Sequence, residues 1–456
     1  MKLNKDTNYL IVIFFSVALI FLDAYKIFSI PIPWIGMSLL LGLSLFESRN
    51  LFTKNTRDIL LVLLSIVLIP QAIYILFFEA SMSDLIYISL RIFNLVSFIF
   101  VLFFTLYFIK NEKLDLFLKY TKYLIYFFST LTIYIFIAQI FDLYEPLRNR
   151  SNTNIYGESM QSIFWLSEPH RAMGTFREPV FLVTFLFPIV LLYIHNETRK
   201  TFLVPVLSGI ALGLTRSNYI KLFCIIFIVF FLIQYFLKRK IKYEFIVFFI
   251  LIFIFSTFGV FECNLNPNSN ECMEYKEDVE NMNSSGEIKI DSNIDEPVVE
   301  LGNDRVNVVK YFLTSIKFVN PDSFSNVNSD FQSYSSLKVN EEMYFSNRTL
   351  PKYLLQRYST ENFGTGNYSL IKYKINVQNL FVFYTQALGV IFPVFLFLFF
   401  LNFIFTKKIN LKSSFFLLII LFFFVSPIEE VNSYYGLIIG ITYNFLFTDR
   451  IKYEQI

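Results

Sequence analysis

A polar and charged run at residues 167–179 could do chemistry, because it brings cationic, acidic and imidazole side chains close together in the chain. Its ionisable members include His170, Arg171, Arg177 and Glu178. Guanidinium groups bind diphosphate through paired hydrogen bonds, and a neighbouring carboxylate or imidazole could take a proton from a hydroxyl group. We interpret the run as a site for a diphosphate-bearing substrate. An ordinary solvated loop with internal salt bridges is the alternative.

Two further basic residues lie near the junction between the apolar run 201–215 and the apolar run that follows it. Arg216 follows the apolar residues 201–215, and Lys221 comes about one helical turn later. Ionisable side chains near membrane depth are functional candidates, although side chains that snorkel to the lipid headgroups give the same pattern. Arg91 and Asn94 also interrupt an apolar run, and they could equally pair with a neighbouring helix.

A third set of candidates lies in and directly after the long polar segment 262–378. Arg348 and Arg357 stand there without a matching acidic cluster, and Gln378 and Asn379 lead into the next apolar run. An anionic ligand would explain a local excess of basic side chains. A surface helix with solvated charges is the alternative.

The sequence lacks the motifs of the common soluble enzymes. It has no Walker A loop, no dinucleotide-binding glycine fingerprint, no nucleophile elbow and no metal-ligand spacing of His and Cys. The chain contains only 2 histidines. We therefore expect neither a cofactor nor a metal, and a net charge of +3 argues against a nucleic-acid partner.

Membrane helices must position these candidates. The chain has 456 residues, of which 55% are hydrophobic and 16% are charged, whereas a soluble domain has roughly 25% charged residues. A transmembrane helix needs roughly 20 apolar residues. We therefore predict an all-α polytopic membrane protein with about twelve transmembrane helices. The predicted spans are residues 8–23, 28–46, 58–78, 84–109, 119–143, 178–196, 201–215, 217–237, 243–261, 379–405, 413–427 and 433–448.

The distribution of positive charge predicts how these spans are oriented, because Lys and Arg favour cytoplasmic loops. With twelve spans the basic segments, such as those around Lys54, Lys113 and Lys240, all fall on one face. Both termini are then cytoplasmic, and the loops 143–177 and 262–378 lie outside. A chain rich in Phe, Ile, Asn and Lys is typical of an AT-rich bacterial genome, so we expect the bacterial inner membrane.

The predicted spans and loops divide the chain into three parts. Residues 1–261 hold the first nine helices, residues 262–378 form a large extracytoplasmic loop, and residues 379–456 hold the last three helices. Cys263 and Cys272 lie near each other at the start of the large loop. An oxidising compartment permits a disulfide between them, and two unpaired thiols are the alternative.

Taken with these residues, the chain resembles the O-antigen polymerase and O-antigen ligase superfamily of integral-membrane glycosyltransferases. The resemblance covers nearly the whole chain, through the number of spans, the cytoplasmic termini and the large third and fifth outer loops. The most specific motif is Arg171-x-x-Gly174-x-Phe176-x-Glu178-Pro179, which is similar to a stretch found in many repeat-unit polymerases. Two weaker matches are Arg348 with Gly364-x-Gly366, and Gln378-Asn379-Leu380 with Gly389.

The resemblance implies a membrane glycosyltransferase (GT-C-like) helical bundle that takes a glycan from undecaprenyl diphosphate on the outer face of the inner membrane. Polymerases pass the glycan to another lipid-linked repeat unit, and no metal is needed. It implies that Arg171, Arg216 and Arg348 hold the donor diphosphate, and that Glu178 or His170 orients or deprotonates the attacking hydroxyl. The residues expected to contact substrate besides these are Arg177, Arg357, Lys221, Gln378 and Asn379.

The chain also departs from the pattern of the superfamily. The Ser-Arg pair usual between the seventh and eighth spans reads Arg216-Ser217-Asn218, so the arginine is displaced. The Arg-x10-Gly spacing of some polymerases is absent. These departures indicate a divergent branch.

Two alternative functions stay open. A ligase would transfer the glycan to lipid A core, but the ligase histidine falls on Gln378, which cannot act as a base. A flippase or other transporter would suit twelve spans, although transporters place their charges near the bilayer midplane. A glycosyltransferase with an acidic pair in the first outer loop is disfavoured, because Asp23 stands alone there. By family analogy the expected partners are undecaprenyl-diphosphate-linked oligosaccharide, membrane lipid, a chain-length regulator and a flippase.

Overall fold

A computed structural model describes most of the apolar part of the chain and little of the long polar loops. The described residues are 5–27, 30–77, 82–109, 112–140, 143, 171–196, 202–236, 242–257, 380, 384, 394, 398, 411–426 and 431–447. They are mostly helical, as an all-α membrane protein requires. The small exception is a two-stranded antiparallel sheet that the sequence did not predict, formed by β1 (Lys26–Ile27) and β2 (Ile30–Pro31).

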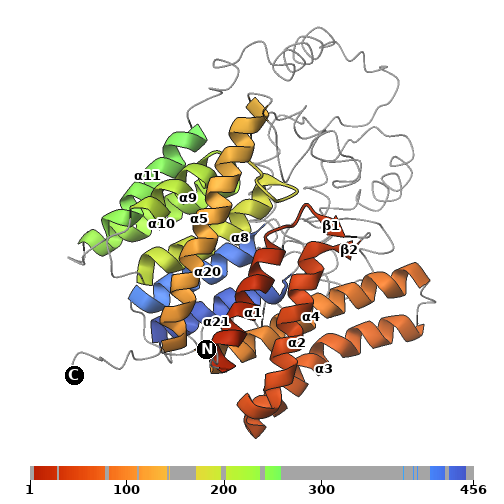
Figure 1. Cartoon of the computed structure of the whole chain (residues 1–456). Helices are drawn as coiled ribbons and strands as arrows, with labels where there is room; N and C mark the ends of the chain where they lie inside the picture. The colour runs from red at the N-terminus through yellow and green to blue at the C-terminus, as the bar shows by residue number, and fades with distance from the viewer. Residues whose placement is uncertain are drawn as a thin grey trace, which may run out of the picture.

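Eleven helices lie within the described residues, each over one of the predicted spans (Figure 1). They are α1 (Lys5–Ile20), α2 (Ile32–Leu51), α3 (Lys54–Phe77), α4 (Met82–Phe108), α5 (Glu112–Ile140), α8 (Pro179–Asn196), α9 (Leu203–Gly213), α10 (Asn218–Phe236), α11 (Tyr243–Thr257), α20 (Leu411–Val425) and α21 (Ser433–Phe447). The span predicted at 379–405 falls almost wholly outside the described residues. Figure 1 shows α9, α10 and α11 grouped at one side of the bundle, and α1 to α4 at the other.

Three stretches of helix are long and apolar enough to cross a membrane, as judged over the described residues. They are Ile88–Phe108, Lys113–Ala138 and Pro179–Asn196. Large apolar side chains are also exposed along the outside of the bundle, where they would be unfavourable in water. On α10 alone these exposed residues are Leu222, Ile225, Ile228, Val229 and Leu232. Contact with lipid explains this exposure.

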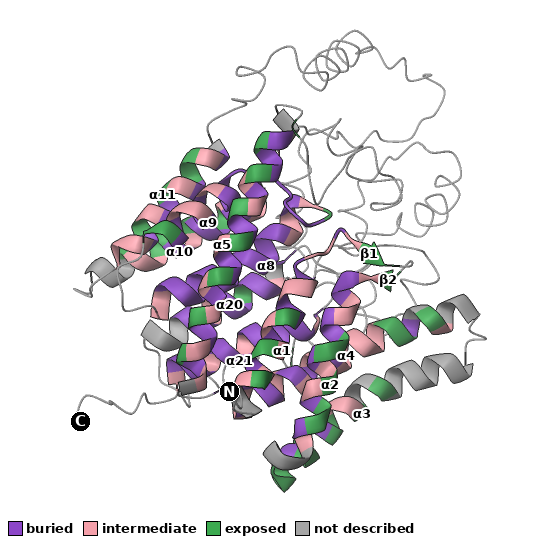
Figure 2. Cartoon of the chain, viewed as in Figure 1, coloured by how far each residue is buried: buried purple, intermediate pink, exposed green. Residues whose placement is uncertain are grey.

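The helix α8 lies at the centre of the bundle and is buried along nearly its whole length (Figure 2). Its Phe187 packs against aromatic rings from three other helices, with ring centroids 5.8 Å from Phe227, 6.0 Å from Phe248 and 5.0 Å from Phe422. Its sequence is apolar on all faces, which is typical of a helix surrounded by other helices. The residues just before α8 are therefore held at one end of a rigid core.

Small residues let two helix pairs approach closely. Gly436 and Gly440 of α21 face α4, where an added Cβ at Gly440 would stand 2.8 Å from the Cβ of Thr105. Asn444, one turn further on, donates to the carbonyl oxygens of Thr105 and Ile109 at 2.9 and 2.8 Å. A Gly-x-x-x-Gly spacing commonly marks such contacts in membranes. These contacts fix α21 against the end of α4.

The second pair is α9 and α11, which meet through Gly209 and Gly213. An added Cβ at Gly213 would come within 2.6 Å of the Phe255 Cβ. Because Gly213 is the last residue of α9, this packing also fixes the turn that follows. That turn carries one of the candidate arginines.

Candidate functional site

The segment 171–178, part of the motif identified in the sequence, lies against the turn between α9 and α10. The backbone N–H of Ala172 donates to the carbonyl oxygen of Leu214 at 2.9 Å. The Nε of Arg171 donates to the carbonyl oxygen of Thr215 at 3.0 Å. Two segments that are distant in the sequence are thereby joined by a backbone bond and a side-chain bond.

The turn between α9 and α10 has an unusual backbone at Arg216. Its φ of +49° lies in the left-handed region, which costs an L-residue roughly 1–2 kcal/mol. The turn is held by the Arg216 N–H, which donates to the Gly213 carbonyl at 3.0 Å, and by the Thr215 hydroxyl, which donates to the Leu212 carbonyl at 2.6 Å. Strained residues of this kind cluster at functional sites.

The two segments together bring Arg171 to the residue that directly precedes Arg216. Both side chains are half-buried. A guanidinium carries five N–H donors and stays charged in proteins. Two of them on adjoining backbone segments suit an anion with several oxygen atoms. Among the described residues, the hydrogen bond to Thr215 thus brings Arg171 close to the backbone of a second predicted site residue, Arg216.

Gly174 and Phe176, at the centre of the motif, have structural roles. Gly174 has a φ of +57°, and an added Cβ would collide with the hydroxyl of Thr132 on α5. Only glycine fits both constraints. Phe176 is fully buried, with its ring centroid 5.5 Å from that of Phe21 and 5.4 Å from that of Phe185.

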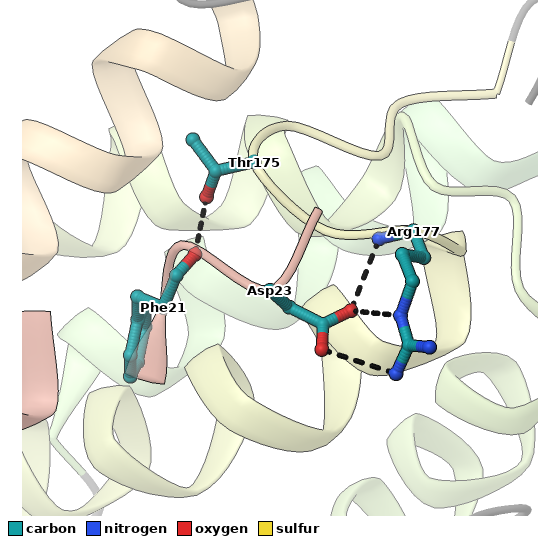
Figure 3. Close-up of polar contacts among 4 residues, drawn as sticks. All are labelled: Phe21, Asp23, Thr175 and Arg177. Carbon is teal, nitrogen blue, oxygen red and sulfur yellow. Dashed lines mark hydrogen bonds and ion pairs between the residues drawn. The ribbon is translucent and has the colours of Figure 1, made fainter. Parts of the chain in front are cut away.

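Arg177 forms an ion pair with Asp23, which follows the end of α1 (Figure 3). Its Nε lies 3.0 Å from Oδ2 of Asp23, and its Nη2 lies 3.3 Å from Oδ1. Beside it, the hydroxyl of Thr175 donates to the carbonyl oxygen of Phe21 at 2.6 Å. From the sequence, Asp23 argues only against an acidic pair in the first outer loop, and nothing along the chain indicates that Arg177 is its partner.

Glu178 precedes the first residue of α8, and its side chain is half-buried. Its carbonyl oxygen accepts from the N–H groups of Phe181 and Leu182 at 3.1 and 3.4 Å. Pro179 occupies the first position of the helix, where a missing N–H does no harm. A carboxylate at this end of α8 is stabilised by the helix dipole.

The remaining predicted site residues divide into those inside and those outside the described residues. Lys221 lies in the first turns of α10 and is half-buried, as are Arg91 and Asn94 of α4. His170, Arg348, Arg357, Gln378, Asn379, Cys263 and Cys272 fall outside the described residues. Among the described residues, no group of three or more His, Cys, Asp or Glu side chains could hold a metal ion.

A cluster of buried hydroxyl groups, which the sequence did not indicate, lies where α8, α20 and α21 meet. Thr184 and Ser426 place their hydroxyl oxygens 3.3 Å apart, and the Tyr434 hydroxyl donates to the carbonyl oxygen of Phe185. The Tyr435 hydroxyl is also buried and lies close to Ser426. These hydroxyls stand in apolar runs, where sequence periodicity gives no signal for them.

Comparisons of the chain with protein-family models, with curated protein sequences and with solved structures found no significant match. The resemblance to the polymerase and ligase superfamily therefore stays a prediction that rests on the short motifs and on the predicted spans and loops of the sequence.

Proposed function

We propose that this protein is a membrane glycosyltransferase that polymerises oligosaccharide repeat units carried on undecaprenyl diphosphate. The reaction would take place on the outer face of a bacterial inner membrane and would yield O-antigen, capsule or exopolysaccharide. The single observation that carries the proposal is the hydrogen bond from Arg171 to the carbonyl oxygen of Thr215, which joins the motif to the turn that contains Arg216.

The arginine pair suits the leaving group of such a reaction. An oxygen of the acceptor hydroxyl attacks the anomeric carbon at the reducing end of the donor glycan. The bond from that carbon to the diphosphate oxygen breaks, and undecaprenyl diphosphate leaves with an additional negative charge. Arg171 and Arg216 would stabilise this growing charge, as positioned cations do in other transferases. Arg348 would be a third cation from the large loop.

The proton of the acceptor hydroxyl needs an acceptor of its own. Glu178 or His170 would serve, because His170 directly precedes Arg171 in the chain and Glu178 ends the segment 171–178. Glu178 directly precedes the helix α8, which holds its backbone in place. No metal is required, because the arginines supply the positive charge that a metal would bring.

A deletion strain complemented with variants tests this proposal in cells. Wild-type protein should restore a ladder of polysaccharide lengths on a gel, whereas Arg171→Ala and Arg216→Ala should leave single repeat units. Arg57→Ala is the matched control, because Arg57 is an exposed arginine in the first turn of α3. Protein amounts must be equal in the membrane fraction. A full ladder with both site variants would refute the proposed roles.

The same gel separates the alternatives that the sequence left open. Complete polymer that stays on the lipid carrier would indicate a ligase, because polymerisation would then precede the missing step. Loss of all outer-face glycan, with lipid-linked repeat units retained inside, would indicate a flippase. Neither outcome is expected from a polymerase.

A further inference from the structure

The segment around Thr175 is fastened to the end of α1 by five hydrogen bonds. In the backbone, the N–H of Ala24 donates to the carbonyl oxygen of Thr175 at 3.0 Å. The Thr175 hydroxyl donates to the Phe21 carbonyl at 2.6 Å. Asp23 accepts the other three, which come from the N–H, Nε and Nη2 of Arg177 at 3.2, 3.0 and 3.3 Å (Figure 3).

The Asp23 carboxylate is the centre of this attachment. Its side chain is 13% exposed, whereas that of Arg177 is 62% exposed. Both carboxylate oxygens accept from Arg177, and one of them also accepts from the Arg177 backbone. The guanidinium carbon in addition lies 5.4 Å from the centre of the Phe181 ring on α8. Two guanidinium–carboxylate hydrogen bonds and one backbone hydrogen bond define the relative orientation of Arg177 and Asp23 better than a single contact would.

The opposite end of the same segment is fastened to the α9–α10 turn through Ala172 and Arg171. The segment is thus held at both ends, by α1 on one side and by the turn on the other. Between these attachments Gly174 passes against Thr132 with no room for a side chain. Displacement at the Asp23 end would therefore move the residues that precede it, including Arg171.

We infer that Asp23 is a positioning residue, which fastens the segment 171–178 so that Arg171 meets the turn of Arg216. The inference rests on the proposed function, because it assigns Asp23 a part in the same reaction. Arg177 then serves the attachment through its bond with Asp23, in place of the substrate contact that the sequence predicted for it. The ion pair couples the end of α1 to the diphosphate site.

A thiol-labelling measurement tests the attachment without depending on the reaction. Ala172 is 1% exposed, so Ala172→Cys places a small buried thiol inside the segment. The protein is treated with a membrane-impermeant maleimide, and mass spectrometry measures the rate of labelling at position 172. Because the measurement is specific to this position, the native cysteines need not be replaced. Adding Asp23→Asn should speed the labelling roughly tenfold, since a charge-assisted hydrogen bond is lost. Asp115→Asn, at an exposed aspartate of α5, is the control and should leave the rate unchanged.

Exchange of the two charges distinguishes attachment from substrate binding. Asp23→Arg combined with Arg177→Asp restores an ion pair but removes the cation from position 177. If Arg177 serves only to hold Asp23, the exchange should slow labelling again and recover part of the polymerisation rate. In the single variant Asp23→Asn, kcat should fall by up to about 10²-fold while KM for the donor changes less, because misplacement acts on the transition state.

The outcomes separate the inference from the proposed function. Faster labelling and lower kcat in Asp23→Asn, both partly reversed by the exchange, support Asp23 as a positioning residue. Unchanged labelling in Asp23→Asn overturns the inference whatever the activity is. Faster labelling in a protein whose wild type lengthens no lipid-linked glycan would overturn the proposed function, and with it the catalytic part of the inference.

Discussion

Arg171 donates from its Nε to the carbonyl oxygen of Thr215 across 3.0 Å, so a side chain of the motif binds the backbone next to Arg216. A bond through Nε orients the plane of the guanidinium and does not itself use the two Nη groups. The neighbouring residue Ala172 binds Leu214 through the backbone, which keeps the two segments in register. Under the proposed function, this contact creates a site for diphosphate.

Arg171→Lys should lower the initial rate of polymer formation at least tenfold. Lysine keeps the positive charge but lacks the planar fork, and it would lose a charge-assisted bond of about 1.5–3 kcal/mol. The rate is measured in membranes that hold equal amounts of protein, with Arg57→Lys as the control. A wild-type rate in Arg171→Lys would mean that charge alone suffices and that the orientation by Thr215 has no catalytic role.

Arg216→Gly should make the protein more stable than Arg216→Ala while both lose activity. Alanine keeps the left-handed backbone penalty at this position, whereas glycine relieves it by about 1 kcal/mol. Unfolding of the two purified variants in increasing concentrations of a denaturing detergent compares their stabilities. Equal stability would show that the φ of +49° is not a source of strain in the folded protein.

Gly174→Ala should loosen the segment 171–178 and reduce activity, because the new methyl group collides with Thr132. Thr132→Ala removes the hydroxyl and the Cγ2, leaving the Thr132 Cβ at 3.3 Å from the added atom. The double variant should therefore recover part of the activity, although the positive φ still disfavours alanine. No recovery would mean that the backbone conformation, and not the collision, decides the effect.

Gly436→Ala should destabilise the bundle by about 1–3 kcal/mol, because the added methyl group would press on the backbone of α4 at Phe98 and Leu102. Gly42→Ala on α2 is the matched control, since nothing lies within 4 Å of the added Cβ there. The control should gain about 0.5–1 kcal/mol from the better helix former. A similar loss in both variants would contradict the close packing of α21 on α4.

The helices were predictable because an apolar run long enough to span a membrane has one favourable backbone structure. In hydrocarbon each N–H and carbonyl group must be paired within its own segment, which helices achieve. The runs at 84–109 and 178–196 accordingly coincide with α4 and α8 to within two residues at each end. Which helices pack together was not predictable, since the Gly436-x-x-x-Gly440 spacing indicates a close helix contact without indicating the partner helix.

The candidate site was predictable only in its parts. The type of residue and its place at the end of a span identified Arg171 and Arg216 as candidates. The contact between their segments depends on packing between distant parts of the chain, and so does the pairing of Arg177 with Asp23. Nothing in the sequence around Asp23 indicates that it pairs with Arg177.

Polymerisation by the purified protein in liposomes tests most directly whether Arg171 and Arg216 form a diphosphate site. The substrate is the lipid-linked repeat unit extracted from the deletion strain, and both glycan length and released undecaprenyl diphosphate are measured. We expect wild-type protein and Arg57→Ala to lengthen the glycan with one carrier released per linkage, and Arg171→Ala and Arg216→Ala to do neither. Lengthening at the wild-type rate by both site variants, or no lengthening by the wild type, would contradict it.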